Sequence, residues 1–161
     1  PSLKEIEIHS LITTIRYETF CRCSSLYQIK IPYSVTVIRE SAFCGCSSKK
    51  EIEIPSLITK IQSYTFYKCS SLKKIKIPSS VTTIKNYAFE GCSSLEQFEF
   101  PPLIKSIERN TFFGGERPKS LFHFTKKVVI TNQIMHYLKS TSKFVDLFKF
   151  SITNIFSNKE N

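Results

Sequence analysis

The sequence predicts a repeat solenoid, with a parallel β-sheet on one face and short strands and turns on the other. Two observations predict it. The segment at residues 72–94, LKKIKIPSSVTTIKNYAFEGCSS, recurs without gaps over residues 3–25, 26–48, 49–71 and 95–117, a period of 23 residues. Periods of about 20–50 residues are typical of solenoids, whose successive coils bury each other's apolar edges. In addition, every copy opens with a strand pattern.

The opening strand pattern reads Leu-x-x-Ile-x-Ile in most copies. Alternating β-branched residues are typical of strands that bury one face. Proline follows directly at Pro32, Pro55, Pro78 and Pro101, and it ends the strand because it has no N–H to donate. The side chains predicted to face inward are Leu3, Ile6, Ile8, Leu26, Ile29, Ile31, Ile52, Ile54, Leu72, Ile75, Ile77, Leu95, Phe98 and Phe100.

The second half of each copy carries two aliphatic residues three apart, then a phenylalanine, and in four copies a cysteine three residues later. A phenylalanine and a cysteine at this spacing fit one turn of α- or 3₁₀-helix with both side chains inward. The phenylalanines are Phe20, Phe43, Phe66, Phe89 and Phe112, and the cysteines are Cys23, Cys46, Cys69 and Cys92.

Composition and charge restrict the class of protein only broadly. The chain has 161 residues, of which 41% are hydrophobic and 22% charged, as in one ordinary globular domain or short repeat array. No apolar run is long enough for a transmembrane helix. Because the chain begins at Pro1 without a methionine, we expect it to be part of a longer product, with any export signal upstream. Its net charge of +10 favours anionic partners without identifying one.

The repeat resembles a known family. Leu-x-x-Ile-x-Ile-Pro-x-Ser-Val-Thr-x-Ile, followed by Ala-Phe-x-x-Cys-Ser-Ser-Leu, is similar to the BspA-type, or Treponema pallidum-type, leucine-rich repeat over residues 1–117. The resemblance implies a leucine-rich-repeat solenoid. It also implies a relation to cell-surface adhesins of bacteria and parasitic protists that bind host matrix proteins. One position differs: where the family usually has glycine, this chain has Arg16, Arg39, Gln62, Lys85 and Glu108, so that turn must tolerate a side chain.

The outward residues of the strands are the candidate binding surface. The middle outward position alternates in sign, as Glu7, Lys30, Glu53, Lys76 and Glu99, which indicates either a device that fixes register or part of a recognition surface. Lysines also gather on the third and fourth predicted strands. They form either a solvated surface or a contact for an anionic partner. Exposed aromatic residues are too few for a nucleic-acid platform. The candidate residues are Tyr27, Gln28, Lys30, Lys50, Glu53, Lys73, Lys74, Lys76, Gln97 and Glu99.

The six cysteines leave three interpretations open. Cys23, Cys46, Cys69 and Cys92 occupy an inward position of the repeat, where cysteine acts as a small buried hydrophobe. Cys21 and Cys44 share another position in neighbouring copies. They are either further reduced thiols or, at the spacing of stacked coils, partners in a disulfide. A metal site is the third interpretation, but Cys-x-Cys lacks the usual zinc spacing, so we predict none.

Residues 118–161 form a second predicted segment. A degenerate sixth repeat begins there, with Phe122–Phe124 as a strand displaced by one residue. Thr131 or Asn132 can cap a helix over residues 133–150, with Ile134, Leu138, Val145 and Phe148 on one side and Lys139 and Lys143 on the other. We predict that this helix caps the last coil; a basic membrane-surface helix or disorder are the alternatives. The end, Ser157–Asn161, is expected to be frayed.

Catalysis is not predicted. The chain has a single aspartate, Asp146, and its three histidines lack a nucleophile or acidic partner at a recognisable spacing. With four glycines, it also has no phosphate-binding glycine loop, and we predict no cofactor. The function predicted is a non-catalytic protein-binding module, at the cell surface or secreted by the family resemblance. The alternatives are a cytoplasmic repeat scaffold, membrane-peripheral through the basic helix, and a polyanion binder at Lys73, Lys74 and Lys76.

Overall fold

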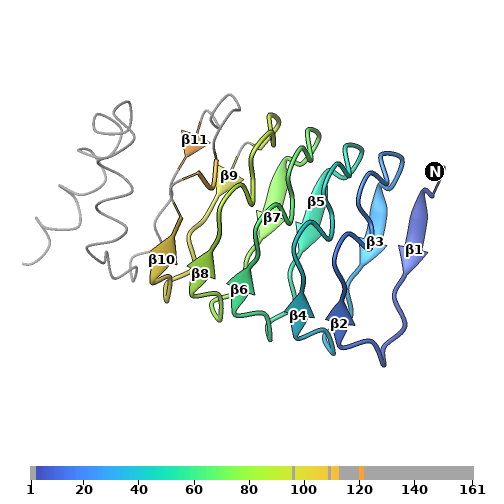
Figure 1. Cartoon of the computed structure of the whole chain (residues 1–161), viewed down its shortest axis with the longest axis horizontal. Helices are drawn as coiled ribbons and strands as arrows, with labels where there is room; N and C mark the ends of the chain where they lie inside the picture. Colours follow the sequence, from blue (N-terminus) through green and yellow to red (C-terminus); the bar gives the residue numbers. More distant parts are fainter. Residues whose placement is uncertain (1–2, 96, 109, 113–119, 122–161) are drawn as a thin grey trace, which may run out of the picture.

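Successive coils of the chain stack side by side along one axis (Figure 1). The structure is a computed structural model that describes residues 3–95, 97–108, 110–112 and 120–121. We number the coils from the N-terminus. Coil 1 is residues 3–25, coil 2 is 26–48, coil 3 is 49–71, coil 4 is 72–94 and coil 5 is 95–117.

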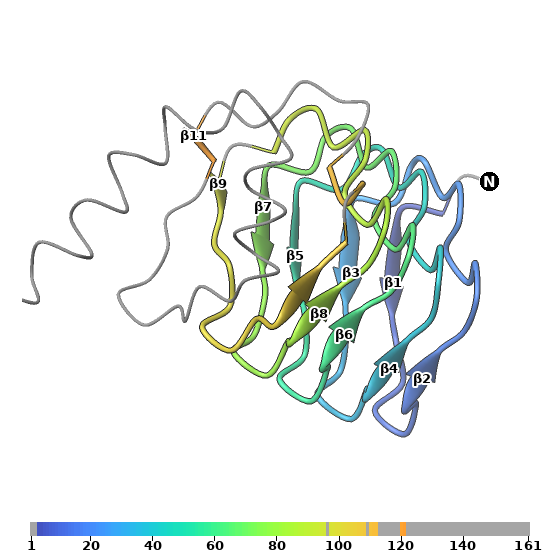
Figure 2. The same cartoon turned by 60° about the vertical axis from the view of Figure 1, so that its left-hand side comes forward.

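Each coil contributes one strand to each of two facing rows (Figure 2). All the paired strands are parallel, and partner residues lie 23 positions apart, as in Glu5 with Gln28. The predicted parallel solenoid is therefore confirmed. The first row contains β1 (Glu5–Glu7), β3 (Gln28–Lys30), β5 (Glu51–Glu53), β7 (Lys74–Lys76), β9 (Gln97–Phe98) and β11 (Ser120–Leu121). The second contains β2 (Thr14–Ile15), β4 (Val37–Ile38), β6 (Lys60–Ile61), β8 (Thr83–Ile84) and β10 (Ser106–Ile107).

Tight turns close each coil after the second strand, and they take the place of the α- or 3₁₀-helical turn that the sequence predicts. The amide of Cys23 donates to the Phe20 carbonyl at 3.2 Å, and Cys92 donates to Phe89 at 3.3 Å. Left-handed backbone does not fall on the position where the family usually has glycine. It comes two residues later, at Glu18, Ser41, Tyr64 and Tyr87, with φ between 53° and 60°. The arginine, glutamine and lysine side chains at the earlier position are tolerated for this reason.

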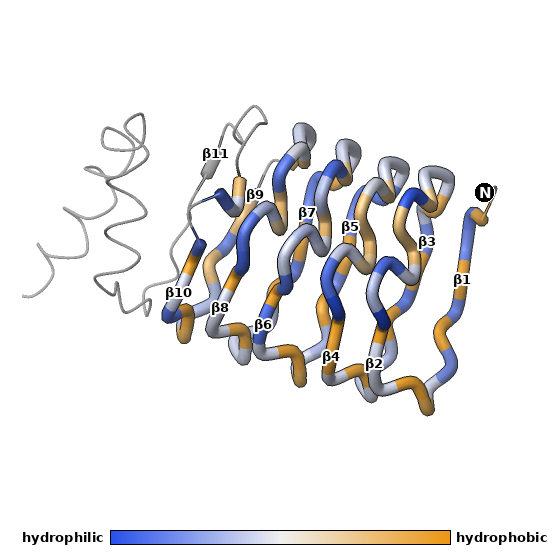
Figure 3. Tube along the Cα trace, viewed as in Figure 1, coloured by the Kyte–Doolittle hydropathy of each residue, from blue (hydrophilic) through white to orange (hydrophobic). Residues whose placement is uncertain are grey.

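The core lies between the two rows and is built from the alternating apolar residues that Figure 3 shows along the strands. A stack of phenylalanine rings runs through the coils. Ring centroids are 5.4 Å apart for Phe20 and Phe43, 5.6 Å for Phe43 and Phe66, and 5.5 Å for Phe66 and Phe89, and the planes are nearly parallel. Each coil thus continues the core of its neighbour, which makes stability dependent on contacts between adjacent coils.

Coil 1 departs from the predicted burial pattern. Leu3 and Ile12 are 36% and 42% exposed, whereas the equivalent Leu26 and Val35 of coil 2 are fully buried. Leu3 holds the repeat position of Leu26 but is less buried than an inward residue of the inner coils. Among the described residues coil 1 has a packed neighbour on one side only, whereas coil 2 is covered on both.

Both rows of strands are interrupted at one boundary, which we call the seam, between coil 2 and coil 3. β1 pairs with β3 and β5 with β7, but β3 does not pair with β5, and β4 does not pair with β6. Where three coils begin with a buried leucine, coil 3 begins with Lys49, and its Nζ donates to the Tyr27 carbonyl at 3.0 Å. The seam is instead joined through the turns, where the amide of Phe43 donates to the Thr65 carbonyl at 3.0 Å.

The described part of the chain contains strands and turns but no helix. β11 continues the 23-residue register, with Ser120 opposite Gln97. The predicted strand at Phe122–Phe124, the capping helix at residues 133–150 and the frayed end all lie outside the described residues. The division at residue 117 remains a prediction.

Candidate functional site

The outward side of the first row of strands forms one exposed surface, which we call the sheet face. It is exposed because every second residue of the strands points away from the core. Tyr27, Gln28, Lys30, Lys50, Glu53, Lys73, Lys74, Lys76 and Glu99 are all exposed, as the alternation predicts. Gln97 belongs to β9 and pairs with Lys74. Most of the predicted candidate residues are therefore exposed on the same side of the coils, which is divided between coil 2 and coil 3, where β3 and β5 do not pair.

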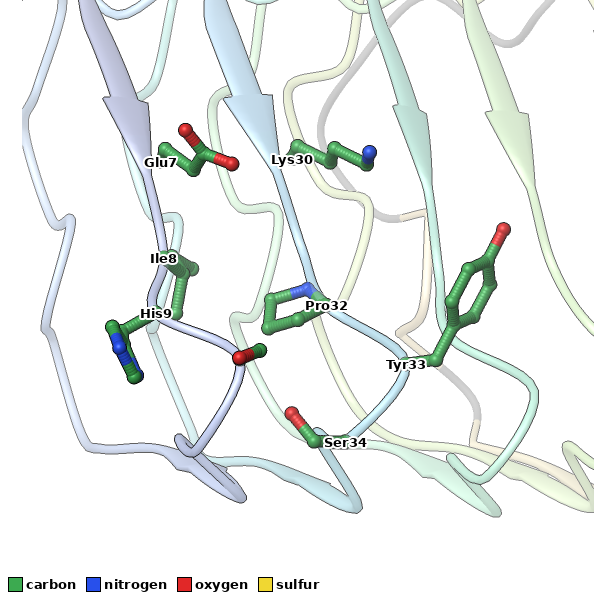
Figure 4. Close-up of a pocket in the computed structure, with 8 residues that line it drawn as sticks. Glu7, Ile8, His9, Lys30, Pro32, Tyr33 and Ser34 are labelled. Atoms are coloured by element: carbon green, nitrogen blue, oxygen red, sulfur yellow. The ribbon is translucent and has the colours of Figure 1, made fainter.

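Opposite charges lie beside each other on the sheet face. Glu7 is the register partner of Lys30, and Glu53 is the partner of Lys76. Lys76 Nζ lies 2.6 Å from Glu53 Oε1, and this hydrogen bond raises the pKa of the exposed Lys76 ammonium. In contrast, the Lys30 side chain extends away from β1 (Figure 4).

The lysine cluster consists of Lys50, just before β5, and of Lys73, Lys74 and Lys76 at β7, and it is interleaved with carboxylates. Glu51 lies opposite Lys74, as Glu53 lies opposite Lys76. An adjacent carboxylate reduces the positive potential that a phosphate or sulfate group would meet. The geometry therefore gives less support to polyanion binding than the count of lysines does.

Tyr27 is an exposed aromatic residue of the sheet face. Its side chain is 49% exposed, and its hydroxyl donates to the Glu5 carboxylate of the neighbouring strand. That hydrogen bond raises the pKa of the phenol. A ring held in place on a polar surface is a typical anchor of protein interfaces, because tyrosine buries a large area at low entropic cost.

Cys23, Cys46, Cys69 and Cys92, which we call the thiol ladder, are buried as predicted. Three of their thiols also donate hydrogen bonds to the phenylalanine carbonyl of the preceding coil: Cys46 to Phe20 and Cys69 to Phe43 at 3.2 Å, and Cys92 to Phe66 at 3.1 Å. Burial raises the pKa of Cys46 and of Cys92 to about 12. Sequence reasoning missed this donor role; its signal was the recurrence of cysteine rather than alanine or valine.

Cys21 and Cys44 differ from the thiol ladder. All six cysteines are free thiols in the structure, but Cys21 and Cys44 are only half-buried. The pKa of Cys44 is raised to about 11, mainly by burial and to a smaller extent by the neighbouring Cys21 thiol. Within the described residues, no cluster of histidine, cysteine and carboxylate side chains could hold a metal ion.

Two surface features were not singled out from the sequence. One is an open depression of about 690 Å³ beside the ends of β1 and β3, lined by Glu7, Ile8, His9, Ser10, Lys30, Pro32, Tyr33 and Ser34 (Figure 4). His9 accepts from the Leu11 amide, and Ser34 donates to the Ile12 carbonyl. Both polar groups are thus already engaged in local structure, and the depression has no evident nucleophile with a base.

The other feature is a cluster of tyrosines on the turns of coils 3 and 4. The Tyr64 and Tyr87 rings stack with centroids 4.9 Å apart, and Tyr67 meets Tyr64 edge to face at 5.5 Å. Lys68 Nζ lies 5.1 Å from the centroid of the Tyr67 ring. Tyr64 and Tyr87 occupy the same repeat position, which was the signal available in the sequence.

No helix in the described part of the chain is both long and apolar enough to cross a membrane.

Comparison with known proteins identifies similar repeats. The family model described as "BspA type Leucine rich repeat region (6 copies)" matches residues 1–117. A leucine-rich repeat protein of Treponema pallidum is 31% identical, with a TM-score of 0.61 over 64% of this chain. A leucine-rich cell-surface protein of Faecalibacterium prausnitzii is 34% identical (TM-score 0.63, 69% of this chain), and a leucine-rich repeat protein of Bacteroides ovatus is 30% identical (0.56, 76%). Among curated proteins, none matches the chain.

The chain spans only part of these solved structures. It covers 50% of the Treponema pallidum protein, 30% of the Faecalibacterium prausnitzii protein and 39% of the Bacteroides ovatus protein. The similarity therefore concerns the repeat array and the way its coils stack.

Proposed function

The chain belongs to the BspA-type leucine-rich repeat family, and on that basis we propose that it is a protein-binding module of a cell-surface protein that acts without catalysis. Leucine-rich repeats generally serve as protein-interaction modules. The observation that carries the proposal is the sheet face, which presents ordered side chains at regular intervals over several coils. An extended surface of this kind suits a macromolecular partner better than a small molecule.

Two further observations support the surface role. One of the similar solved structures is described as a leucine-rich cell-surface protein. The sheet face also carries the polar and aromatic side chains of a protein interface, with Tyr27 half-exposed beside Glu5 and Lys76 beside Glu53. A large protein partner can cover these groups together, which is the arrangement expected of an anchor residue within a polar rim.

The surface role is tested by localisation of the full-length product. Intact cells are stained with an antibody against the repeats, before and after permeabilisation, with a cytoplasmic protein as the control for leakage. Staining of intact cells is the expected result. Staining that appears only after permeabilisation would overturn the surface role and favour the cytoplasmic scaffold.

The binding role is tested with purified chain on a panel of immobilised extracellular-matrix proteins. Tyr27→Ala is expected to weaken binding roughly 10-fold or more, as truncation of an interface anchor does. The matched control is Tyr17→Ala, which removes another exposed tyrosine, 61% exposed, from a turn outside the sheet face. Equal effects of the two variants would argue against the sheet face as the binding site. A steep fall of binding with salt would indicate a polyanion instead.

A further inference from the structure

Cys21 and Cys44 are a pair of thiols on adjacent coils. They occupy the same position of the repeat, 23 residues apart. Hydrogen bonds hold the two backbones together around them: the Phe20 amide donates to the Ala42 carbonyl at 2.8 Å, and the Arg22 amide donates to the Cys44 carbonyl at 2.6 Å. The Cys21 side chain lies near enough to Cys44 to contribute, after burial, to the raised pKa of the Cys44 thiol.

The pair differs from the thiol ladder in access and in bonding. Cys23 and Cys46 are also 23 residues apart, but they are 8% and 1% exposed, and the Cys46 thiol is committed to the Phe20 carbonyl. Cys21 and Cys44 are half-buried and occupy the same position of adjacent coils, whose turns are hydrogen-bonded to each other. A small oxidant can therefore reach the pair more readily than the ladder.

We propose that Cys21 and Cys44 form a disulfide that joins coil 1 to coil 2 when the chain meets an oxidising environment. Stacked parallel segments lie about 4.8 Å apart, and disulfides form between Cα atoms about 4.4–6.8 Å apart, so neither coil has to move far. The inference does not depend on the proposed binding function.

The chemistry is thiol–disulfide exchange with a disulfide of a small thiol, such as oxidised glutathione. One cysteine thiolate attacks this disulfide, which forms a mixed disulfide and releases one small thiolate. The second cysteine then attacks the mixed disulfide and releases the other. The protein loses two electrons and two protons, which leave on the two molecules of reduced small thiol.

The disulfide would hold the least enclosed coil of the described structure. Leu3 and Ile12 of coil 1 are partly exposed, and among the described residues only coil 2 packs on coil 1. A covalent link between the turns of these coils opposes their separation, because it restricts the unfolded chain.

The test is oxidation of the whole chain in a glutathione redox buffer, followed by alkylation of free thiols and trypsin digestion. Trypsin cleaves after Arg16, Arg22, Lys30, Arg39 and Lys49, so Cys21 and Cys23 fall in different peptides. The expected product is a linked pair of peptides, residues 17–22 with residues 40–49. Fragmentation beside Gly45 distinguishes Cys44 from Cys46.

Matched variants complete the test. Cys44→Ser should abolish the linked pair, whereas Cys46→Ser should retain it, and circular dichroism confirms that each variant is folded. The oxidised chain is expected to unfold at a temperature several degrees higher than the reduced chain. A Cys23–Cys46 link, a disulfide between two chains, or six fully alkylated cysteines under conditions that oxidise a reference dithiol would each overturn the proposal.

Discussion

At the scale of single residues, each of coils 1–4 has a second residue with left-handed backbone. These residues are Arg22, Gly45, Lys68 and Gly91, with φ between 55° and 73°. Glycine adopts this conformation without strain, whereas other residues do so at a cost of about 1–2 kcal/mol. The two glycines differ in their surroundings. A Cβ on Gly91 would lie 3.2 Å from Lys68 Cα, whereas a Cβ on Gly45 would be 3.5 Å from its nearest atom.

We expect Gly91→Ala to destabilise the chain more than Gly45→Ala. Gly45→Ala should lower the free energy of unfolding by about 1 kcal/mol through backbone conformation alone. Gly91→Ala should lower it by about 2 kcal/mol, because Lys68 must also shift. Urea unfolding of both variants measures the difference. Equal losses of stability would show that Lys68 moves away from the new methyl group at no cost in free energy.

The thiol ladder provides a second test at this scale. Cys69→Ala should lower the free energy of unfolding by about 2 kcal/mol, since it removes the hydrogen bond to Phe43 and leaves a small cavity. Cys69→Ser retains a donor at the same place and should cost less. Thermal or urea unfolding distinguishes the two; a larger loss for serine would mean that the hydrogen bond is unimportant beside the lost sulfur contacts.

The sequence predicted the position of these cysteines but not their bonding. Whether a side chain faces inward follows from its position in the repeat, because equivalent positions of successive coils point the same way. Donation by Sγ to the Phe43 carbonyl depends on how closely two coils approach, and nothing in the residue pattern fixes that distance. The same holds for the partner of Tyr27: its exposure was predictable from alternation, but its hydrogen bond with Glu5 was not.

At the scale of the elements, one departure from the repeat, Lys49, lies at the seam. Lys49 stands where Leu26, Leu72 and Leu95 are fully buried. Burial lowers the pKa of the Lys49 ammonium. The ammonium donates a hydrogen bond to the Tyr27 carbonyl, in place of the backbone amide that would otherwise donate to it. The sequence shows that Lys49 breaks the leucine row. It does not show that two ladders of strand hydrogen bonds are interrupted there.

We expect Lys49→Leu to strengthen the seam. The leucine removes a partly buried charge and restores the apolar contact of the other coils, which should raise the free energy of unfolding by about 1–2 kcal/mol. Leu72→Lys is the matched control, and it should destabilise strongly because position 72 is enclosed. Urea unfolding provides the measurement. A Lys49→Leu variant less stable than the parent chain would show that the Tyr27 contact outweighs the burial of charge.

At the scale of the whole molecule, the thiol ladder should make stability sensitive to alkaline pH. Burial raises the pKa of Cys46 and Cys92 to about 12 and also raises the pKa of Cys69 well above the ordinary value of a thiol. Above pH 9 the unfolded chain therefore loses protons that the folded chain retains, and stability falls as pH rises toward 12. Each thiol should contribute a loss of about 1 kcal/mol by pH ~10. Lys49 has the opposite effect on the pH dependence of stability, because its pKa is lowered in the folded chain. It is one group against three thiols.

Urea unfolding at pH ~8 and ~10 measures this effect. Cys69→Ser provides the control, since it should remove one thiol's share of the pH dependence and leave the rest. A free energy of unfolding that is the same at both values would contradict burial of protonated thiols.

The solenoid should also open in parts. Each intact pair of coils has two hydrogen-bonded ladders, whereas the backbone hydrogen bonds that cross the seam join turns. Native-state hydrogen exchange should therefore show coils 1 and 2 exchanging through a partial opening of lower free energy than coils 3 and 4. Lys49→Leu should bring the two groups closer together. A single exchange free energy for all four coils would show that the array opens as one unit.

The seam has a mechanical consequence as well. If the chain is pulled from its N-terminal end, as a tether between two bodies would pull it, coils detach in order, and resistance should drop once the seam is reached. Coils 1 and 2 together hold 46 residues, which extend to roughly 150 Å when straightened. The module would thus lengthen by this amount under load while coils 3 and 4 keep their sheet face intact.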